Sequence, residues 1–166
     1  MKKILLFIVL ITGFAGLYAC KSETKHPDIS QVSFQLITGE HLKLSQLKGR
    51  PVIVTFWATT CVACIREIPD LLELYHQYSA QGLEIIAVAM PYDRPDHVLE
   101  FSQARKLPYP VALDIDAKVV RSFGNVKLTP NNFLINPDNQ IQHHQIGILD
   151  KDKTIKWLQA TLSSRK

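Results

Sequence analysis

PVIVTFWATTCVACIREIP, residues 51–69, is the segment that decides the fold of this chain. Its first part, Pro51–Trp57, is an unbroken apolar run rich in β-branched residues, which is typical of a central strand buried on both faces. From about Val62 to Ser79 the apolar residues recur at helical spacing, and Gly82 follows as a stop signal. The segment therefore predicts a buried strand that leads directly into an amphipathic helix.

Two cysteines stand at the junction between this strand and this helix. Cys61 and Cys64 form a CxxC motif, whose spacing brings the two sulfurs within disulfide reach across a first helical turn. Helix N-terminal N–H groups and the helix dipole stabilise a thiolate, so we expect Cys61 to be the nucleophile. Cys64, one turn deeper, should keep its proton until it resolves a mixed disulfide. The motif also leaves open an inert structural disulfide or half of a zinc site, although zinc needs a second pair of ligands.

Composition narrows the class of protein. The chain has 166 residues, of which 46% are hydrophobic and 20% charged, with 7 Gly, 9 Pro and 3 Cys. These values exclude a polar disordered chain, a collagen-like fibre and a polytopic membrane protein. Three cysteines are too few for a disulfide-held scaffold, so a packed core must supply the stability. The net charge of +4 is too small to indicate a nucleic-acid partner, and we expect one domain.

The N-terminal residues have the pattern of an export signal. Lys2 and Lys3 precede an apolar run, Ile4–Ala19, whose 16 residues are fewer than the roughly 20 that span a bilayer. The position of Cys20 resembles that of the lipidated cysteine in bacterial lipoproteins. We therefore expect residues 1–19 to be a lipoprotein signal peptide, Cys20 to carry the lipid, residues 20–30 to form a tether and residues 31–166 to form the domain. A plain secretory signal and an uncleaved anchor are the alternatives.

Strand and helix patterns alternate along the rest of the chain, which indicates a sheet with helices on both faces. A β-hairpin is expected over residues 32–44, with its turn at Thr38-Gly39-Glu40. The other predicted elements are strands at 83–90, 111–115, 132–136 and 141–148, and helices at 95–106, at 118–123 and from about 150 onward.

Two segments together resemble the TlpA/ResA-like family of thioredoxin-fold thiol–disulfide oxidoreductases. Phe56–Pro69 is similar to the active-site segment of that family, and Leu128–Asn136 (LTPNNFLIN) resembles its cis-proline segment and the strand that follows. The resemblance covers roughly residues 31–163. It implies an α/β thioredoxin-like fold with a central mixed sheet, helices on both faces and an N-terminal β-hairpin. The long interval before the proline places an extra strand–helix unit near residues 83–113.

The resemblance also implies a substrate-binding surface around the cysteines. Thr129-Pro130 would be a cis peptide, with Pro130 packed against the dithiol and the backbone of Thr129 pairing with an incoming polypeptide strand. Thr60 stands directly before the nucleophile, where many relatives have Trp. Trp57 is expected in the core, where it would also shield the active site. We assign these four residues to substrate binding.

Glu67 lies one helical turn after Cys64, where ResA-like proteins carry a glutamate. The resemblance implies that Glu67 exchanges protons with the dithiol and so has a catalytic role beside Cys61 and Cys64. Thr55 occupies the strand position at which thioredoxin has a buried aspartate, which makes Glu67 the carboxylate available for this task. Its residue type alone also allows a solvated surface glutamate or an ion pair with an arginine.

These features imply an extracytoplasmic, membrane-anchored lipoprotein, on the periplasmic side in a Gram-negative cell, that reduces protein disulfides. Reduction of a substrate would leave Cys61 and Cys64 joined as a disulfide, and the family implies a membrane electron donor of the DsbD/CcdA kind. Because the dithiol is the redox centre, we expect no diffusible cofactor and no metal. We also expect a monomer without a nucleic-acid partner.

Two rival functions remain open at this point. A thiol peroxidase would need a threonine three residues before the reactive cysteine, where Ala58 stands. A thioredoxin-fold module that binds or delivers copper would use a three-residue gap between its cysteines, whereas Cys61 and Cys64 are separated by two residues.

Overall fold

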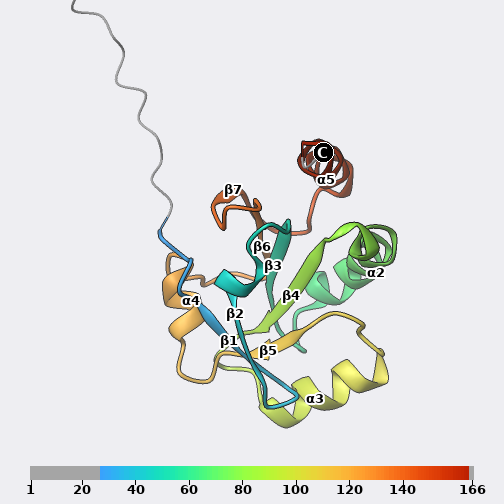
Figure 1. Cartoon of the computed structure of the whole chain (residues 1–166). Helices are drawn as coiled ribbons and strands as arrows, with labels where there is room; N and C mark the ends of the chain where they lie inside the picture. Colours follow the sequence, from blue (N-terminus) through green and yellow to red (C-terminus); the bar gives the residue numbers. More distant parts are fainter. Residues whose placement is uncertain (1–26, 165–166) are drawn as a thin grey trace, which may run out of the picture.

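The structure is a computed structural model that describes residues 27–164 (Figure 1). The expected signal peptide, the lipidation site Cys20 and most of the expected tether lie outside the described residues. The elements in chain order are β1 (Ser33–Leu36), β2 (His41–Lys43), η1 (Leu44–Leu47), β3 (Val52–Trp57), α2 (Val62–Tyr78), η2 (Ser79–Gln81), β4 (Glu84–Ala89), α3 (Pro95–Ala104), β5 (Val111–Leu113), α4 (Lys118–Ser122), β6 (Asn131–Ile135), β7 (Ile141–Ile146) and α5 (Lys151–Ser163).

The described strands form one mixed seven-stranded sheet in the order β2-β1-β5-β4-β3-β6-β7. β3, β4 and β5 run parallel, whereas β6 is antiparallel to β3 and to β7, and β1 is antiparallel to β5 and to β2. A parallel pair needs a crossover connection, which α2 supplies between β3 and β4 and α3 between β4 and β5. The predicted mixed sheet, its N-terminal hairpin and the extra unit before the proline are confirmed.

The central strand β3 is buried along its whole length. Successive side chains of a strand point to opposite faces of the sheet. Val54 and Phe56 accordingly belong to one apolar cluster, and Ile53 and Trp57 to the other. The unbroken apolar run in the sequence reflects this burial on both faces, because each residue of β3 meets a core layer.

The helices divide between the two faces of the sheet. α2, α3 and α5 contribute Leu74, Val98 and Leu158 to the cluster that contains Trp57. α4 contributes Val119 to the opposite cluster, and in Figure 1 it lies across the strands from α2. The prediction of helices on both faces is therefore confirmed. The chain that leaves the C-terminal end of β3 enters α2, which packs on one of these two faces.

Glycines set two of the element boundaries. Gly82, with φ of 110°, ends the short η2 turn that follows α2. Gly147 has φ of 95°, a left-handed conformation that favours glycine, so β7 ends at Ile146 rather than at the predicted Ile148. The N–H of Gly147 donates to the carbonyl of Pro130 at 2.8 Å, which holds the end of β7 beside the start of β6.

The packed domain begins earlier than residue 31. Ile29, inside the range expected to be a tether, is 1% exposed and belongs to the core cluster on the α4 face. Its carbonyl accepts a hydrogen bond from the N–H of Val32 at 3.0 Å, which turns the chain into β1. A single isoleucine within a polar segment has no periodicity, so the pattern of the sequence did not reveal this contact.

Replacing Ile29 by alanine should lower the free energy of unfolding by about 2–5 kcal/mol, because it removes a buried side chain and leaves a cavity. Chemical denaturation of the oxidised protein measures the change. Gln31→Ala is the matched control, since Gln31 is exposed, and it should change stability by less than about 0.5 kcal/mol. Equal effects of the two substitutions would place the start of the packed domain after Ile29.

Candidate active site

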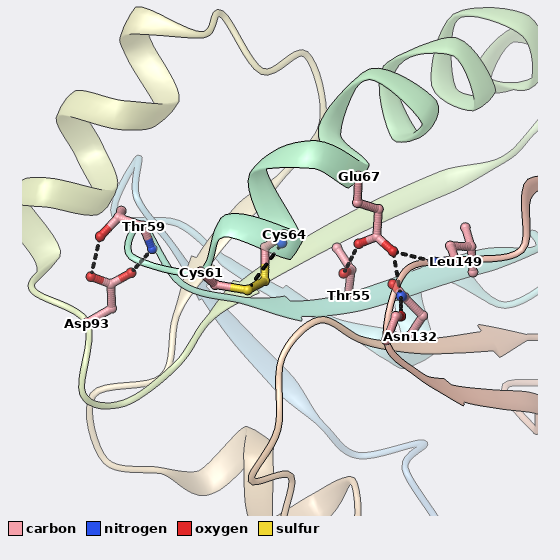
Figure 2. The surroundings of a disulfide bond; sticks show 9 residues. Thr55, Thr59, Cys61, Cys64, Glu67, Asp93, Asn132 and Leu149 are labelled. Carbon is pink, nitrogen blue, oxygen red and sulfur yellow. Dashed lines mark hydrogen bonds between the residues drawn. A yellow bond between two sulfur atoms is a disulfide. The ribbon is translucent and has the colours of Figure 1, made fainter.

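Cys61 and Cys64 form a disulfide at the start of α2 (Figure 2). Their Cα atoms are 5.2 Å apart. Cys61 is the N-cap residue of the helix, with extended backbone angles, and its sulfur accepts a hydrogen bond from the N–H of Cys64 at 3.1 Å. The predicted pairing of the two cysteines, at the point where β3 hands over to α2, is therefore present in the structure.

The surroundings of the two sulfurs differ, and this difference separates their roles. Cys61 is half-buried and takes the position at which a helix offers unpaired N–H groups to an anion. A thiolate at Cys61 is stabilised there by the helix dipole and by the N–H of Cys64. Cys64 is 2% exposed and packs in the core, so it is out of reach of a bulky partner. This arrangement suits Cys61 as the attacking sulfur and Cys64 as the resolving sulfur.

The Thr129-Pro130 peptide bond is cis, as predicted. β6 begins directly after Pro130, and its register pairs Asn131 with Phe56 on β3. Continuing that antiparallel register brings Pro130 opposite Trp57, at the end of β3 from which the Cys61 loop departs. Pro130 is buried and Thr129 is half-buried. The proline segment and the disulfide thus lie at the same edge of the sheet.

Glu67 is a buried carboxylate, 1% exposed, on the face of α2 that meets the sheet. Its Oε1 accepts hydrogen bonds from Asn132 Nδ2 at 2.8 Å and from the N–H of Leu149 at 2.5 Å, and its Oε2 accepts one from Thr55 Oγ1 at 3.4 Å (Figure 2). The alternatives of a surface glutamate and of an arginine ion pair are therefore wrong, because all three partners are neutral groups in the interior.

Burial raises the pKa of Glu67 above its ordinary value, since desolvation disfavours the charged form. The hydrogen bonds from Leu149, Asn132 and Thr55 oppose this rise because they stabilise the carboxylate, and the nearby charge of Asp70 adds to it. A raised pKa favours the protonated form of this carboxyl group, which is the direction that proton exchange with a thiol requires.

A small cavity of about 10 Å³ is lined by both Cys64 and Glu67. Such a volume is about the least that accommodates one water molecule, roughly 10–15 Å³. Thr55, Trp57 and Tyr109 also line it, and the buried indole N–H of Trp57 has no hydrogen-bond partner among the described residues. The resolving sulfur and the buried carboxylate therefore border one shared space.

The two remaining residues assigned to substrate binding occupy different environments. Thr60 is exposed directly before Cys61. Trp57 is 4% exposed and packs against Phe101, with ring centroids 5.3 Å apart. The indole of Trp57 therefore belongs to the core beneath the disulfide, as also expected, and it offers no surface to a substrate. The assignment of Trp57 to substrate binding is corrected to a supporting role.

Three residues around the site were missed in the sequence. Asn132 is a fully buried polar residue in a strand that is buried throughout, and this conflict with its surroundings was a usable signal. Asp93 follows the C-terminal end of β4 and binds Thr59 through both carboxylate oxygens. The N–H of Leu149 reaches Glu67 only because the chain turns after β7, which no pattern of residue types reports.

Two features are absent from residues 27–164. No group of three or more His, Cys, Asp or Glu side chains is placed to hold a metal ion there. None of the helices in that part of the chain combines the length and the apolarity needed to cross a membrane.

The fold and the site together define a class of protein, the thioredoxin-fold thiol–disulfide oxidoreductases. The defining features are the mixed sheet, the CxxC disulfide at the start of a helix and the cis-proline at the same edge of the sheet. The AhpC/TSA family matches residues 23–144, and the chain belongs to this family and to its ResA-like thiol–disulfide oxidoreductases. The protein is accordingly an oxidoreductase of the ResA type, with Cys61 and Cys64 as its redox pair.

Three similar proteins illustrate the relationship. Thiol-disulfide oxidoreductase ResA from Bacillus anthracis is 35% identical over 123 residues, which are 74% of this chain and 69% of that protein. Sporulation thiol-disulfide oxidoreductase A from Bacillus subtilis is 24% identical over 161 residues, 94% of this chain and 96% of that protein. The crystal structure of a thiol:disulfide interchange protein from Chlorobium tepidum has the same fold, with a TM-score of 0.74 at 21% identity over 85% of this chain and 99% of that one.

Replacing Glu67 by glutamine should remove a pH-dependent loss of stability. A carboxyl group whose pKa is higher in the folded protein than in the unfolded chain stays protonated up to a higher pH when the protein is folded. The free energy of unfolding therefore falls as the pH rises past the ordinary pKa of 4.5. A glutamine side chain does not titrate, so the stability of Glu67→Gln minus that of the wild type should increase with pH above this value.

Chemical denaturation of the oxidised proteins across this pH range tests the prediction. Glu40→Gln is the control, because Glu40 is exposed, and its difference from the wild type should stay flat. A flat difference for Glu67→Gln as well would contradict the cost of burying this carboxylate.

Proposed function

We propose that this protein reduces disulfide bonds in other proteins outside the cytoplasm, while a lipid on Cys20 holds it at a membrane. The observation that carries the proposal is the asymmetric pair of sulfurs at the head of α2. Cys61 is reachable and its thiolate is stabilised, whereas Cys64 is buried one turn below. An inert structural disulfide needs neither of these features.

The reaction proceeds through a mixed disulfide. The Cys61 thiolate attacks one sulfur of the substrate disulfide, forms a bond to it and displaces the other substrate sulfur as a thiolate, which takes up a proton. Cys64 then loses its proton, attacks Cys61 and displaces the substrate's second sulfur, which is protonated in turn. The substrate gains two electrons and two protons, and the Cys61–Cys64 disulfide of the structure is re-formed.

Glu67 is the group that takes the proton from Cys64 in this scheme. Its burial, its raised pKa and the cavity that it lines together with Cys64 support this role. Thr55 and Asn132 hold the carboxylate in place through hydrogen bonds, so the acceptor oxygen keeps its position while the sulfur bonds change.

The segment before Pro130 is the proposed docking strand. In residues 27–164 the backbone N–H and C=O of Thr129 make no hydrogen bond, while the carbonyl of Pro130 is occupied by Gly147. An extended polypeptide can therefore pair with Thr129 as it would with an edge strand. Such pairing would bring the substrate cysteine to Cys61, beside the exposed Thr60.

The oxidised enzyme needs a donor of two electrons for each cycle, and we assign this task to a membrane dithiol protein of the DsbD/CcdA kind. Two features support an extracytoplasmic location. The N-terminal residues have the pattern of a lipoprotein signal, and a mycobacterial relative of the same fold, 17% identical, is described as secreted. Disulfides form and persist in that environment, so a reductase has substrates there.

Cys61→Ser should abolish insulin reduction in the presence of dithiothreitol, because it removes the nucleophile. Cys64→Ser should instead accumulate a covalent complex with the substrate, because the mixed disulfide cannot be resolved. Loss of turnover and a band that disappears on reduction in a gel are the two readouts. Insulin reduction by Cys61→Ser at the wild-type rate would refute the assignment of the nucleophile.

Cys20→Ala should move the full-length protein from the detergent phase to the aqueous phase when cells that express it are partitioned with Triton X-114, because the lipid is no longer attached. Cys61→Ser is the matched control and should remain in the detergent phase, since it keeps Cys20. A Cys20→Ala protein that stays in the detergent phase would contradict lipid anchoring and indicate an uncleaved apolar segment.

A further inference from the structure

The large apolar side chains exposed in residues 27–164 are concentrated at one edge of the sheet. Six of them lie at or near strand ends at this edge: Val62, Tyr92, Ile115, Leu128, Ile146 and Ile148. Each of these is at least 41% exposed, and Leu99 on α3, at 39%, is the exception to the pattern. Exposed apolar residues that gather at one place mark a binding surface.

The sheet topology brings these residues to the edge that carries the disulfide. In the parallel strands β3, β4 and β5, Trp57 pairs with Ala89, and Ala89 pairs with Leu113. The C-terminal ends of these three strands therefore lie level with one another at the same edge of the sheet. β6 runs the opposite way and starts at this edge with Asn131, which pairs with Ile146 at the end of β7. The Cys61 loop leaves from the end of β3. The exposed apolar residues therefore lie at the same edge of the sheet as the reacting sulfur.

Tyr92 is distinguished among them by how its loop is held. The loop after β4 is tied to the loop before Cys61 by Asp93, whose Oδ2 accepts from the N–H of Thr59 at 2.6 Å and whose Oδ1 accepts from Thr59 Oγ1 at 2.8 Å (Figure 2). A third bond, from the N–H of Met90 to the carbonyl of Trp57 at 2.9 Å, joins the same two chain segments. Tyr92 itself is 64% exposed and packs in neither core cluster.

We call the pair of hydrogen bonds between Asp93 and Thr59 the latch, and Asp93 makes no competing ion pair with its neighbouring cation. The neighbouring cation, Arg94, pairs with Asp96 through Nη2 at 2.6 Å and not with Asp93. Both carboxylate oxygens of Asp93 are bonded to Thr59, two residues before the nucleophile. The two hydrogen bonds therefore fix the position of Tyr92 relative to Cys61, although the two lie far apart in sequence.

We propose that Tyr92 is a specificity-determining residue that receives an apolar side chain next to the reacting cysteine of an extended polypeptide substrate. Asp93 is the positioning residue that holds Tyr92 at the active site. This inference rests on the proposed function and names the substrate class for it. The disulfide and these apolar side chains lie at the same edge of the sheet, and the Tyr92 loop is bonded to Thr59 two residues before Cys61, so the occupant we assign is the polypeptide that carries the reacting disulfide. A tyrosine ring offers that chain a large, rigid apolar contact.

Stopped-flow measurement of the rate at which the reduced protein reacts with three disulfide probes tests this role. Two probes are disulfide-cyclised peptides of equal length, one with Leu and Phe beside its cysteines and the other with Ser and Gln. The third is hydroxyethyl disulfide, which has no side chain for Tyr92 to contact. Tyr92→Ala should lower the rate with the apolar peptide, relative to the rate with the polar peptide, by about tenfold. Tyr92→Phe should keep the preference because it keeps the ring.

Variants of the latch separate positioning from folding. Asp93→Ala should lower the same rate ratio as Tyr92→Ala does, whereas Asp93→Asn should retain most of it, because an amide can accept from the Thr59 N–H and donate to the Thr59 hydroxyl. Leu99→Ala removes an exposed apolar side chain on α3, away from the strand ends, and should leave the ratio unchanged.

An unchanged ratio in Tyr92→Ala would overturn the assignment of Tyr92. Equal losses in Asp93→Asn and Asp93→Ala would overturn the latch. Failure of the wild-type protein to react even with hydroxyethyl disulfide would overturn the proposed function itself, and with it the role of Tyr92, so the two failures are distinguishable.

Discussion

The hydrogen bond from the N–H of Cys64 to the sulfur of Cys61 joins the fold of this protein to its chemistry. It exists because β3, buried on both faces, ends at the sheet edge and the chain turns at once into α2. The first helical turn then presents N–H groups that have no partner within the helix, and Cys61 occupies the capping position. A thiolate in that position is more stable than the thiolate of a free cysteine, so the fold itself favours Cys61 as the nucleophile.

Glu67 ties the same helix to the other half of the sheet. Its carboxylate is bound by a strand residue from β3, a strand residue from β6 and a backbone N–H from the turn before α5. Segments from both halves of the chain therefore converge on one buried carboxylate, which lines the same cavity as Cys64. A buried carboxyl group carries a desolvation cost, and the raised pKa of Glu67 expresses it. In the proposed mechanism, this destabilising group stands where Cys64 needs a proton acceptor.

Much of this arrangement was predictable, for physical reasons that differ between residues. The run Pro51–Trp57 predicted β3 because burial on both faces demands an apolar side chain at almost every position. Cys61, Cys64 and the cis-Pro130 were found because their order and residue types match a family pattern. The burial of Ile29, the network around Glu67 and the contact between Asp93 and Thr59 were not found, because each joins residues far apart in the chain or lies in a segment without periodicity.

A redox titration of the Cys20→Ala protein is the most direct test of the central claim that Cys61 and Cys64 form an exchangeable redox pair. The protein is equilibrated in dithiothreitol buffers of graded potential, its thiols are trapped by alkylation, and the peptides that contain Cys61 and Cys64 are weighed by mass spectrometry. A single reversible transition in which both cysteines change together is expected for a two-electron couple. A disulfide that stays closed at every potential, or cysteines that react independently, would contradict the claim.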